Sequence, residues 1–233
     1  TCWSRFYYIV LCIGLRIVMK SFEIYIILKN HFGEIGSWWP KDSPFEVVIG
    51  AILTQQSTWT NVEKAIKNLK EENILTPRDI SSIPLDKLKH LIKPSGFFNQ
   101  KAERLKGISE YILKNYKGDI NLLLSKNKAE LREELLKFKG VGKETADSII
   151  LYAAEKNEFV VDAYTKRLYS RLGNVEENIE YDDLKKYIIT EIPEELKLYQ
   201  EFHGLIVLLG KNLCKKKNPK CISCPLASKC NFN

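Results

Sequence analysis

Apolar residues recur along most of this chain at the three- and four-residue spacing of amphipathic helices. Only short runs could form strands, and no repeat, low-complexity tract or Gly/Ser linker interrupts the pattern. Helices are predicted over 21–32, from 44, from about 61, over 95–116, twice within 119–137, after 142, over 163–171, over 181–192 and over 193–213. We therefore predict an all-α fold.

Two of these helices meet at Gly140-Val141-Gly142, where one apolar periodic run ends and the next begins. Glycines let the backbone turn tightly and approach a partner closely, and the first-turn amides of a helix lack intrahelical acceptors. Together with the helix dipole and the neighbouring Lys139 and Lys143, the turn is a candidate phosphate-binding site. Taken alone, the same glycines indicate only a turn between helices.

A carboxylate follows the second helix after a short apolar run. Residues 158–161 (EFVV) lead to Asp162, and the residues after it begin another helix. An aspartate in front of a helix is most often an N-cap that accepts hydrogen bonds from first-turn amides. The residues themselves therefore supply an anion site and an acid, and they leave open whether the acid caps a helix or takes part in chemistry.

The segments LLKFKGVGKETAD (135–147) and VVDAYTKRL (160–168) resemble, at this separation, the helix-hairpin-helix, Gly-Pro-Asp motif of the endonuclease III superfamily of DNA glycosylases. The resemblance covers nearly everything after Met19 and includes GFFNQKAERL, which is similar to the family's GxYNxKAxxL segment. It implies two interlocked helical domains. These are a six-helix barrel over 44–155 with the helix-hairpin-helix at 131–155, and an iron–sulfur cluster domain from 19–43 and 156–233.

The resemblance also implies a base excision repair glycosylase acting on double-stranded DNA with a damaged or mismatched base. It assigns catalysis to Asp162 and DNA binding to the hairpin residues Lys139, Gly140, Val141, Gly142, Lys143 and Thr145. Gln56 falls on a family glutamine that enters the space left by an extruded base, whereas Gln55 and Trp59 depart from that stretch. The alternative for both glutamines is that they cap and solvate a helix end.

Bifunctional relatives carry a hairpin lysine whose amine attacks the sugar. Glu144 occupies that position here, eighteen residues before Asp162, and Lys143 is displaced by one residue, or about 100° around the helix. We therefore expect a monofunctional glycosylase in which Lys143 contacts phosphate and Glu144 lines the base pocket or stabilises the first helical turn. The alternatives are a bifunctional glycosylase and AP lyase that uses Lys143, and a non-catalytic damaged-DNA-binding or redox-responsive protein.

A weaker similarity, in the hairpin and in the glutamine-rich helix end, is to a 3-methyladenine glycosylase branch of the superfamily. An alkylated, positively charged purine would suit a pocket with Glu144 and aromatic groups. Oxidised pyrimidines and mismatched thymine or uracil stay open. Trp38 and Trp39 are predicted to be packing residues, and His203 a core histidine or one that supports another site residue.

The six cysteines are unevenly distributed, with Cys2 and Cys12 near the start and four in the last twenty residues: Cys214, Cys221, Cys224 and Cys230. These four are separated by six, two and five residues. Structural zinc usually takes two short chelating pairs, whereas a cuboidal iron–sulfur cluster needs four thiolates around it. The spacing also resembles the family's cluster loop, so we assign a [4Fe–4S] cluster, with zinc as the alternative. Five nearby lysines are candidate phosphate contacts: Lys211, Lys215, Lys216, Lys217 and Lys220.

Charge and the N-terminal segment change the picture only slightly. The net charge of +7 favours a polyanionic partner without a histone-like excess. The apolar run within residues 1–18 is short for a membrane span, and Met19 is the only methionine. We expect 1–18 to be a non-native or disordered extension from a start assigned too far upstream, with a membrane anchor as the rival explanation. The expected protein is a monomeric, cytoplasmic, nucleoid-associated enzyme with no membrane partner.

Overall fold

The computed structural model describes residues 19–36, 38–39 and 41–232, so the predicted extension at 1–18 lies outside the described residues. All regular elements in this described part are helical, which confirms the all-α prediction. The α-helices are α1 (Ser21–Phe32), α2 (Pro44–Leu53), α3 (Trp59–Glu71), α4 (Pro77–Ser82), α5 (Leu85–Ile92), α6 (Phe98–Tyr116), α7 (Ile120–Leu124), α8 (Lys128–Leu136), α9 (Lys143–Tyr152), α10 (Ala163–Leu172), α11 (Tyr181–Thr190) and α12 (Leu196–Asn212). None of these helices is both long and apolar enough to cross a lipid bilayer.

Side-chain caps explain where several helices begin. The Ser43 hydroxyl accepts from the Glu46 amide in front of α2, whose first residue is proline. The Thr76 and Asp79 side chains form a reciprocal capping box at the start of α4. Because each cap satisfies amides that the helix cannot satisfy itself, these polar residues fix the boundaries that apolar periodicity alone leaves uncertain.

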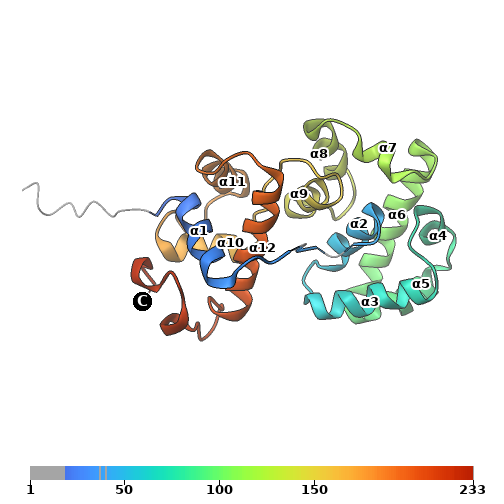
Figure 1. The fold of residues 1–233 in the computed structure, drawn as a ribbon. Helices are drawn as coiled ribbons and strands as arrows, with labels where there is room; N and C mark the ends of the chain where they lie inside the picture. The colour runs from blue at the N-terminus through green and yellow to red at the C-terminus, as the bar shows by residue number, and fades with distance from the viewer. Residues whose placement is uncertain (1–18, 37, 40, 233) are drawn as a thin grey trace, which may run out of the picture.

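The helices form two lobes (Figure 1). Helices α2 to α8 lie in one lobe, while α1, α10, α11, α12 and the C-terminal segment lie in the other, with α9 between them. Helix α12 packs against α1 and α10, and α9 contacts α2, α8 and α12. This arrangement places the helix that follows the glycine turn at the junction of the lobes. The division of the chain into domains near residues 44 and 155 stays a prediction.

Trp39, on the segment that joins the two lobes, packs where they meet. Its side chain is buried, and its ring lies 5.3 Å from that of Trp59 on α3 and 5.0 Å from that of Tyr152 on α9. Its indole also lies against Gly50 of α2, where a Cβ would stand 3.2 Å from the ring. The crossing segment is therefore held by aromatic packing.

A buried ionic network joins α9 to both lobes. The Asp147 carboxylate on α9 is fully buried, 2.7 Å from Arg132 Nε of α8 and 2.9 Å from Lys185 Nζ of α11. The Tyr181 hydroxyl donates to the same carboxylate at 2.9 Å. A buried carboxylate is costly unless it is paired and hydrogen-bonded, so this network fixes α9 against α8 and α11 together.

We expect Arg132→Met to lower the free energy of unfolding by about 3 kcal/mol, because it removes one partner of a fully buried carboxylate. The matched control is Lys137→Met, which removes an exposed ion pair with Glu133 and is expected to leave the free energy of unfolding nearly unchanged. Urea unfolding of both variants measures the difference. Equal costs for the two variants would show that the buried network does not hold α9.

Candidate active site

The predicted hairpin lies between α8 and α9. Gly140 has φ +81, a left-handed conformation that glycine adopts without strain, and a Cβ there would stand 2.1 Å from Arg104 Nε. Gly142 is the N-cap of α9 and supplies no side-chain cap, so the first-turn amides of this helix are left for an outside acceptor. Lys139 is exposed beside the turn, whereas the Val141 side chain is buried and its amide donates to the Phe138 carbonyl at 3.0 Å.

Gln55, a residue that departs from the family stretch, ties the end of α2 to this hairpin. Its Nε2 donates to the Gly140 carbonyl at 2.8 Å and to the Thr145 hydroxyl at 2.9 Å. Arg104 of α6 donates in turn to Gln55 Oε1. The Thr145 side chain is buried in this network, so its backbone amide is the part of the residue left for a phosphate. No spacing rule relates residues 55, 104 and 140, so this contact could not be predicted from the sequence.

Gln56 occupies the next position, on the turn after α2. Its φ of +52 is left-handed, and its side chain is exposed. Because Gln55 holds the hairpin from the preceding residue, the exposed glutamine and the glycine turn are fixed relative to each other. This geometry is compatible with the proposed role of Gln56 as a wedge.

The two hairpin glycines provide a matched pair for testing the turn. We expect Gly140→Ala to lower stability by about 1–2 kcal/mol, since alanine is strained at φ +81 and must also displace Arg104. Gly142→Ala meets nothing within 4 Å at an unstrained φ, so its cost should stay within about 0.5 kcal/mol. Urea midpoints compare the two. A Gly142→Ala variant as unstable as Gly140→Ala would contradict this account of the turn.

The Asp162 carboxylate is both a helix cap and an accessible acid. Its Oδ1 accepts from the Thr165 amide at 2.7 Å and the Thr165 hydroxyl at 2.8 Å, capping α10 as expected. Its Oδ2 lies 3.7 Å from His203 Nε2 of α12, and 12% of the side chain is exposed. Burial alone would raise the pKa of the Asp162 carboxyl, but the adjacent His203 and Thr165 outweigh it and hold the pKa below its ordinary value. The group is therefore ionised at neutral pH.

Glu144, in the first turn of α9, is the charged neighbour of Asp162. Its side chain is reached by solvent, yet the protein around the carboxyl desolvates it, and the charge of Asp162 adds to the effect. Together these raise the pKa of Glu144 to about 7, against a smaller opposing influence of His203. At neutral pH the carboxyl is consequently shared between its ionised form and a neutral form that can donate a hydrogen bond.

The Lys143 side chain pairs with a residue of the other lobe. Its ammonium lies 2.5 Å from Asp182 of α11, which also pairs with Arg132 at 2.9 Å. Asp182 is held ionised because Lys143 lowers the pKa of its carboxyl. The structure thus brings Glu144 electrostatically close to Asp162 and engages Lys143 with the other lobe.

A cavity of about 720 Å³ lies beside α12 and is lined in part by Trp38, Trp39 and Tyr152. Its lining includes none of Gln56, Glu144 and Asp162. The group of candidate site residues is therefore distinct from this cavity.

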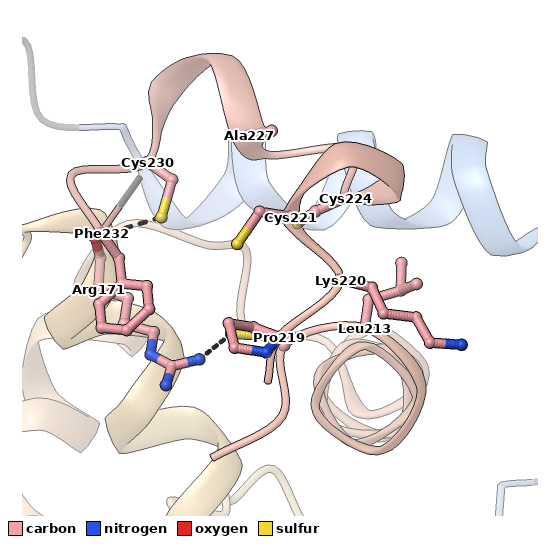
Figure 2. A pocket seen from close by; sticks show the side chains of 10 residues that line it. Arg171, Leu213, Pro219, Lys220, Cys221, Cys224, Ala227, Cys230 and Phe232 are labelled. Atoms are coloured by element: carbon pink, nitrogen blue, oxygen red, sulfur yellow. Dashed lines mark hydrogen bonds between the residues drawn. The ribbon is translucent and has the colours of Figure 1, made fainter. Parts of the chain in front are cut away.

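The four C-terminal cysteines gather around one space. Figure 2 shows the sulfur atoms of Cys221 and Cys230 pointing into a small pocket that also has Cys214 and Cys224 in its wall. All four are half-buried free thiols. Within the described part of the chain, no three His, Cys, Asp or Glu side chains converge as ligands of a single metal ion. Thiols distributed around a space suit a cluster that takes one thiolate for each iron.

Arg171 of α10 anchors this cysteine loop. Its Nη1 lies 3.3 Å from Cys214 Sγ and donates to the Lys215 carbonyl at 2.8 Å, while its own carbonyl accepts from the Asn231 amide at 3.0 Å. Its guanidinium lies 4.0 Å from the centroid of the Phe232 ring (Figure 2). The loop's lysines are exposed around it: Lys211, Lys215, Lys216, Lys217 and Lys220. The cysteine loop is consequently fixed to α10, the helix that Asp162 caps.

Comparison with known proteins is consistent with this geometry. Residues 49–194 match the model of the HhH-GPD superfamily base excision DNA repair proteins. The chain is 47% identical over 210 residues to a Methanocaldococcus jannaschii protein provisionally named a DNA repair glycosylase, covering 90% of this chain and 94% of that one. It is 33% identical to endonuclease III of Thermotoga maritima, covering 81% and 83% of the two chains.

Two solved structures share the fold. The 3-methyladenine DNA glycosylase of H. pylori, bound to 1,N6-ethenoadenine, superimposes with a TM-score of 0.72 at 34% identity and covers 83% of this chain and 98% of that one. A non-covalent complex of endonuclease III with DNA superimposes with a TM-score of 0.79 at 26% identity and covers 92% and 96%. With the hairpin, the carboxylate after it and the family match all in place, the chain belongs to the HhH-GPD superfamily of base excision DNA repair proteins.

Proposed function

We propose that this base excision DNA glycosylase is monofunctional, that Asp162 directs hydrolysis of the N-glycosidic bond, and that the abasic strand is left intact. One observation carries the proposal. The ionised Asp162 carboxylate has one oxygen committed to capping α10 and the other free of close donors, and its charged neighbour in α9 is Glu144 and not a lysine.

The chemistry needs three parts. An enzyme that acts on a base in duplex DNA must take the base out of the stack, which requires a phosphate grip and a group to fill the vacated space. The uncapped start of α9 and the exposed Gln56 would provide these. Cleavage develops positive charge on the sugar, which the Asp162 carboxylate would stabilise while Oδ2 orients the attacking water.

The state of Lys143 supports hydrolysis over lyase chemistry. An amine nucleophile must be unprotonated and near the sugar, whereas the Lys143 ammonium is paired with Asp182 at 2.5 Å. Releasing it would take from Asp182 of α11 one of its two cationic partners and leave Arg132 as the other. The bifunctional alternative therefore requires a rearrangement that the monofunctional mechanism does not.

An alkylated purine is the substrate class we favour. Glu144, close to Asp162 and with a pKa of about 7, offers the base either a negative charge or a hydrogen-bond donor. A positively charged alkylated base would be attracted by the first form, and a neutral adduct could accept from the second. The H. pylori relative with bound 1,N6-ethenoadenine supports the same class.

We further propose that Cys214, Cys221, Cys224 and Cys230 hold a [4Fe–4S] cluster, since their thiols line one space and are fixed to α10 through Arg171. A bound cluster would supply a structural cross-link of the C-terminal segment. The lysines around it would then be held in place to contact DNA phosphates.

A lesion panel tests this function. Duplexes that each carry 3-methyladenine, 1,N6-ethenoadenine, an oxidised pyrimidine, or mismatched thymine or uracil are incubated with the protein, with and without later alkali. We expect release of an alkylated purine and strand breakage only after alkali. Release of none of these bases would overturn the proposed substrate class, and direct nicking would overturn the monofunctional mechanism.

A further inference from the structure

Asp162 faces the buried side chain of His203, which in turn contacts the buried side chain of Tyr152. The His203 side chain is 6% exposed, with Nε2 3.7 Å from Asp162 Oδ2 and Nδ1 2.7 Å from the Tyr152 hydroxyl. Nε2 is buried and makes no hydrogen bond of its own. A buried polar atom without a partner is costly and uncommon, so its position next to the free carboxylate oxygen requires a reason.

The Tyr152 hydroxyl decides where the imidazole carries its proton. Burial raises the pKa of this phenol well above its ordinary value, so the hydroxyl keeps its proton at neutral pH. Its contact with His203 Nδ1, at 2.7 Å, is shorter than its other contact, 3.4 Å to the Gln200 carbonyl. When the hydroxyl donates to Nδ1, that nitrogen is the acceptor, and the proton of a neutral imidazole must sit on Nε2.

We propose that Tyr152 and His203 are positioning residues for Asp162: the Tyr152 hydroxyl fixes the Nε2–H tautomer of His203, and this N–H directs Asp162 Oδ2 towards the reacting sugar. The inference rests on the proposed catalytic role of Asp162. In this arrangement Thr165 holds Oδ1 of the carboxylate, and His203 faces Oδ2 from the other side at 3.7 Å.

The present separation fits this role. At 3.7 Å the Nε2–Oδ2 contact is too long for a hydrogen bond, and a movement of about 1 Å would close it. Catalytic hydrogen bonds are often long in the free enzyme and tighten when substrate binds. His203 and Asp162 lie on α12 and at the start of α10, in the same lobe, so a small side-chain movement is enough.

The rate of base release at acidic pH should depend on the contact between His203 Nε2 and Asp162 Oδ2. The titratable groups facing His203 are Tyr152 and Glu144 from α9 and Asp162 from the start of α10. Lys41 of the segment between the lobes reaches the Tyr152 carbonyl and not the imidazole. A donor at Nε2 favours the ionised form of Asp162, so removing the donor raises the pKa of Asp162 and moves the acid limb to higher pH.

Three variants of one residue separate positioning from packing. Glutamine places its amide near the position of Nε2, asparagine reaches only as far as Nδ1, and leucine has no donor. We expect His203→Gln to keep the single-turnover rate of base release within about threefold. His203→Asn and His203→Leu should lose about tenfold or more below pH 7, with the acid limb shifted by about one pH unit. The affinity of the His203 variants for substrate duplex should stay unchanged. The pH profile of Glu144→Gln, measured in parallel, identifies the part of the pH dependence that is due to Glu144.

A second measurement does not depend on turnover. Nitrogen NMR of the three histidines should show a protonated Nε2 in His203, and Tyr152→Phe should move part of that proton to Nδ1. A protonated Nδ1 of His203 in the wild-type protein would overturn the proposal. So would an equal loss of the single-turnover rate in His203→Gln and His203→Asn, or a pH profile of His203→Leu whose acid limb is not shifted. If no lesion is released while NMR shows the Nε2–H tautomer and its dependence on Tyr152, the proposed function fails and the tautomer assignment stands.

Discussion

Asp162→Asn should lower the single-turnover rate of base release by about 10³-fold or more while leaving duplex affinity within about threefold of the wild-type value. The expected loss follows from charge. Asparagine keeps the shape of the side chain, but it cannot stabilise the positive charge that develops on the sugar. In the proposed function substrate binding would depend on the hairpin, which the substitution does not touch.

The capping role of Asp162 makes this substitution informative. Asparagine is as good an N-cap as aspartate, and its Oδ1 can still accept from the Thr165 amide, so α10 should be retained. Asp119→Asn is the matched control, because Asp119 caps α7 by accepting from the Asn121 amide at 2.8 Å and has no place in the site. Melting temperatures of both variants should match the wild type. An Asp162→Asn enzyme with an unchanged rate would show that the residue is only a cap.

Cys221→Ala should abolish the brown absorbance, reduce iron from about four atoms per chain to well below one, and lower the melting temperature by on the order of 10 °C. The segment from Cys214 to Cys230 has no long regular element of its own, only the short turns at Cys221–Ser223 and Ala227–Lys229. A segment of this kind would depend on the proposed cluster for its order. Part of the soluble yield should be lost with the cluster.

Ser223→Ala is the control for the cluster, since Ser223 is an exposed residue between two of the cysteines and supplies no thiol. It should leave colour, iron content and melting temperature unchanged. Metal analysis of the native protein checks the assignment independently. A colourless native protein that holds one zinc ion per chain would contradict it.

The helical architecture could be predicted because its signals are local. The apolar spacing between Ser21 and Phe32 coincides with α1, and the glycines at 140 and 142 mark the break between α8 and α9. The position of Asp162 in front of α10 likewise followed from its own neighbours. The family resemblance, and not these local signals, indicated base excision repair, and the family match confirms the family.

Contacts between distant residues could not be predicted in this way. Gln55 meets Gly140 across 85 positions of sequence, and Tyr152 meets His203 across 51. His203 did carry a weak signal, because a histidine in an apolar helix requires a polar partner. Its partners, however, are chosen by the packing of α12 against α9 and α10, which no periodicity in the chain encodes.

The pairing of Lys143 with Asp182 is a further case. Its position in the hairpin allowed either phosphate contact or nucleophilic attack, and helical geometry left both open. The ion pair that Lys143 makes depends on α11, almost forty residues later, which places Asp182 within 2.5 Å of the ammonium. Electrostatic partners of this kind depend on the fold as a whole.

Borohydride trapping on duplex DNA with an abasic site tests the central claim most directly, because it detects a covalent amine–sugar intermediate whatever the preferred base. We predict no protein–DNA adduct with the wild-type protein or with Lys143→Ala, together with base release that depends on Asp162. A wild-type adduct that disappears in Lys143→Ala would show that an amine attacks the sugar and would contradict hydrolysis directed by Asp162.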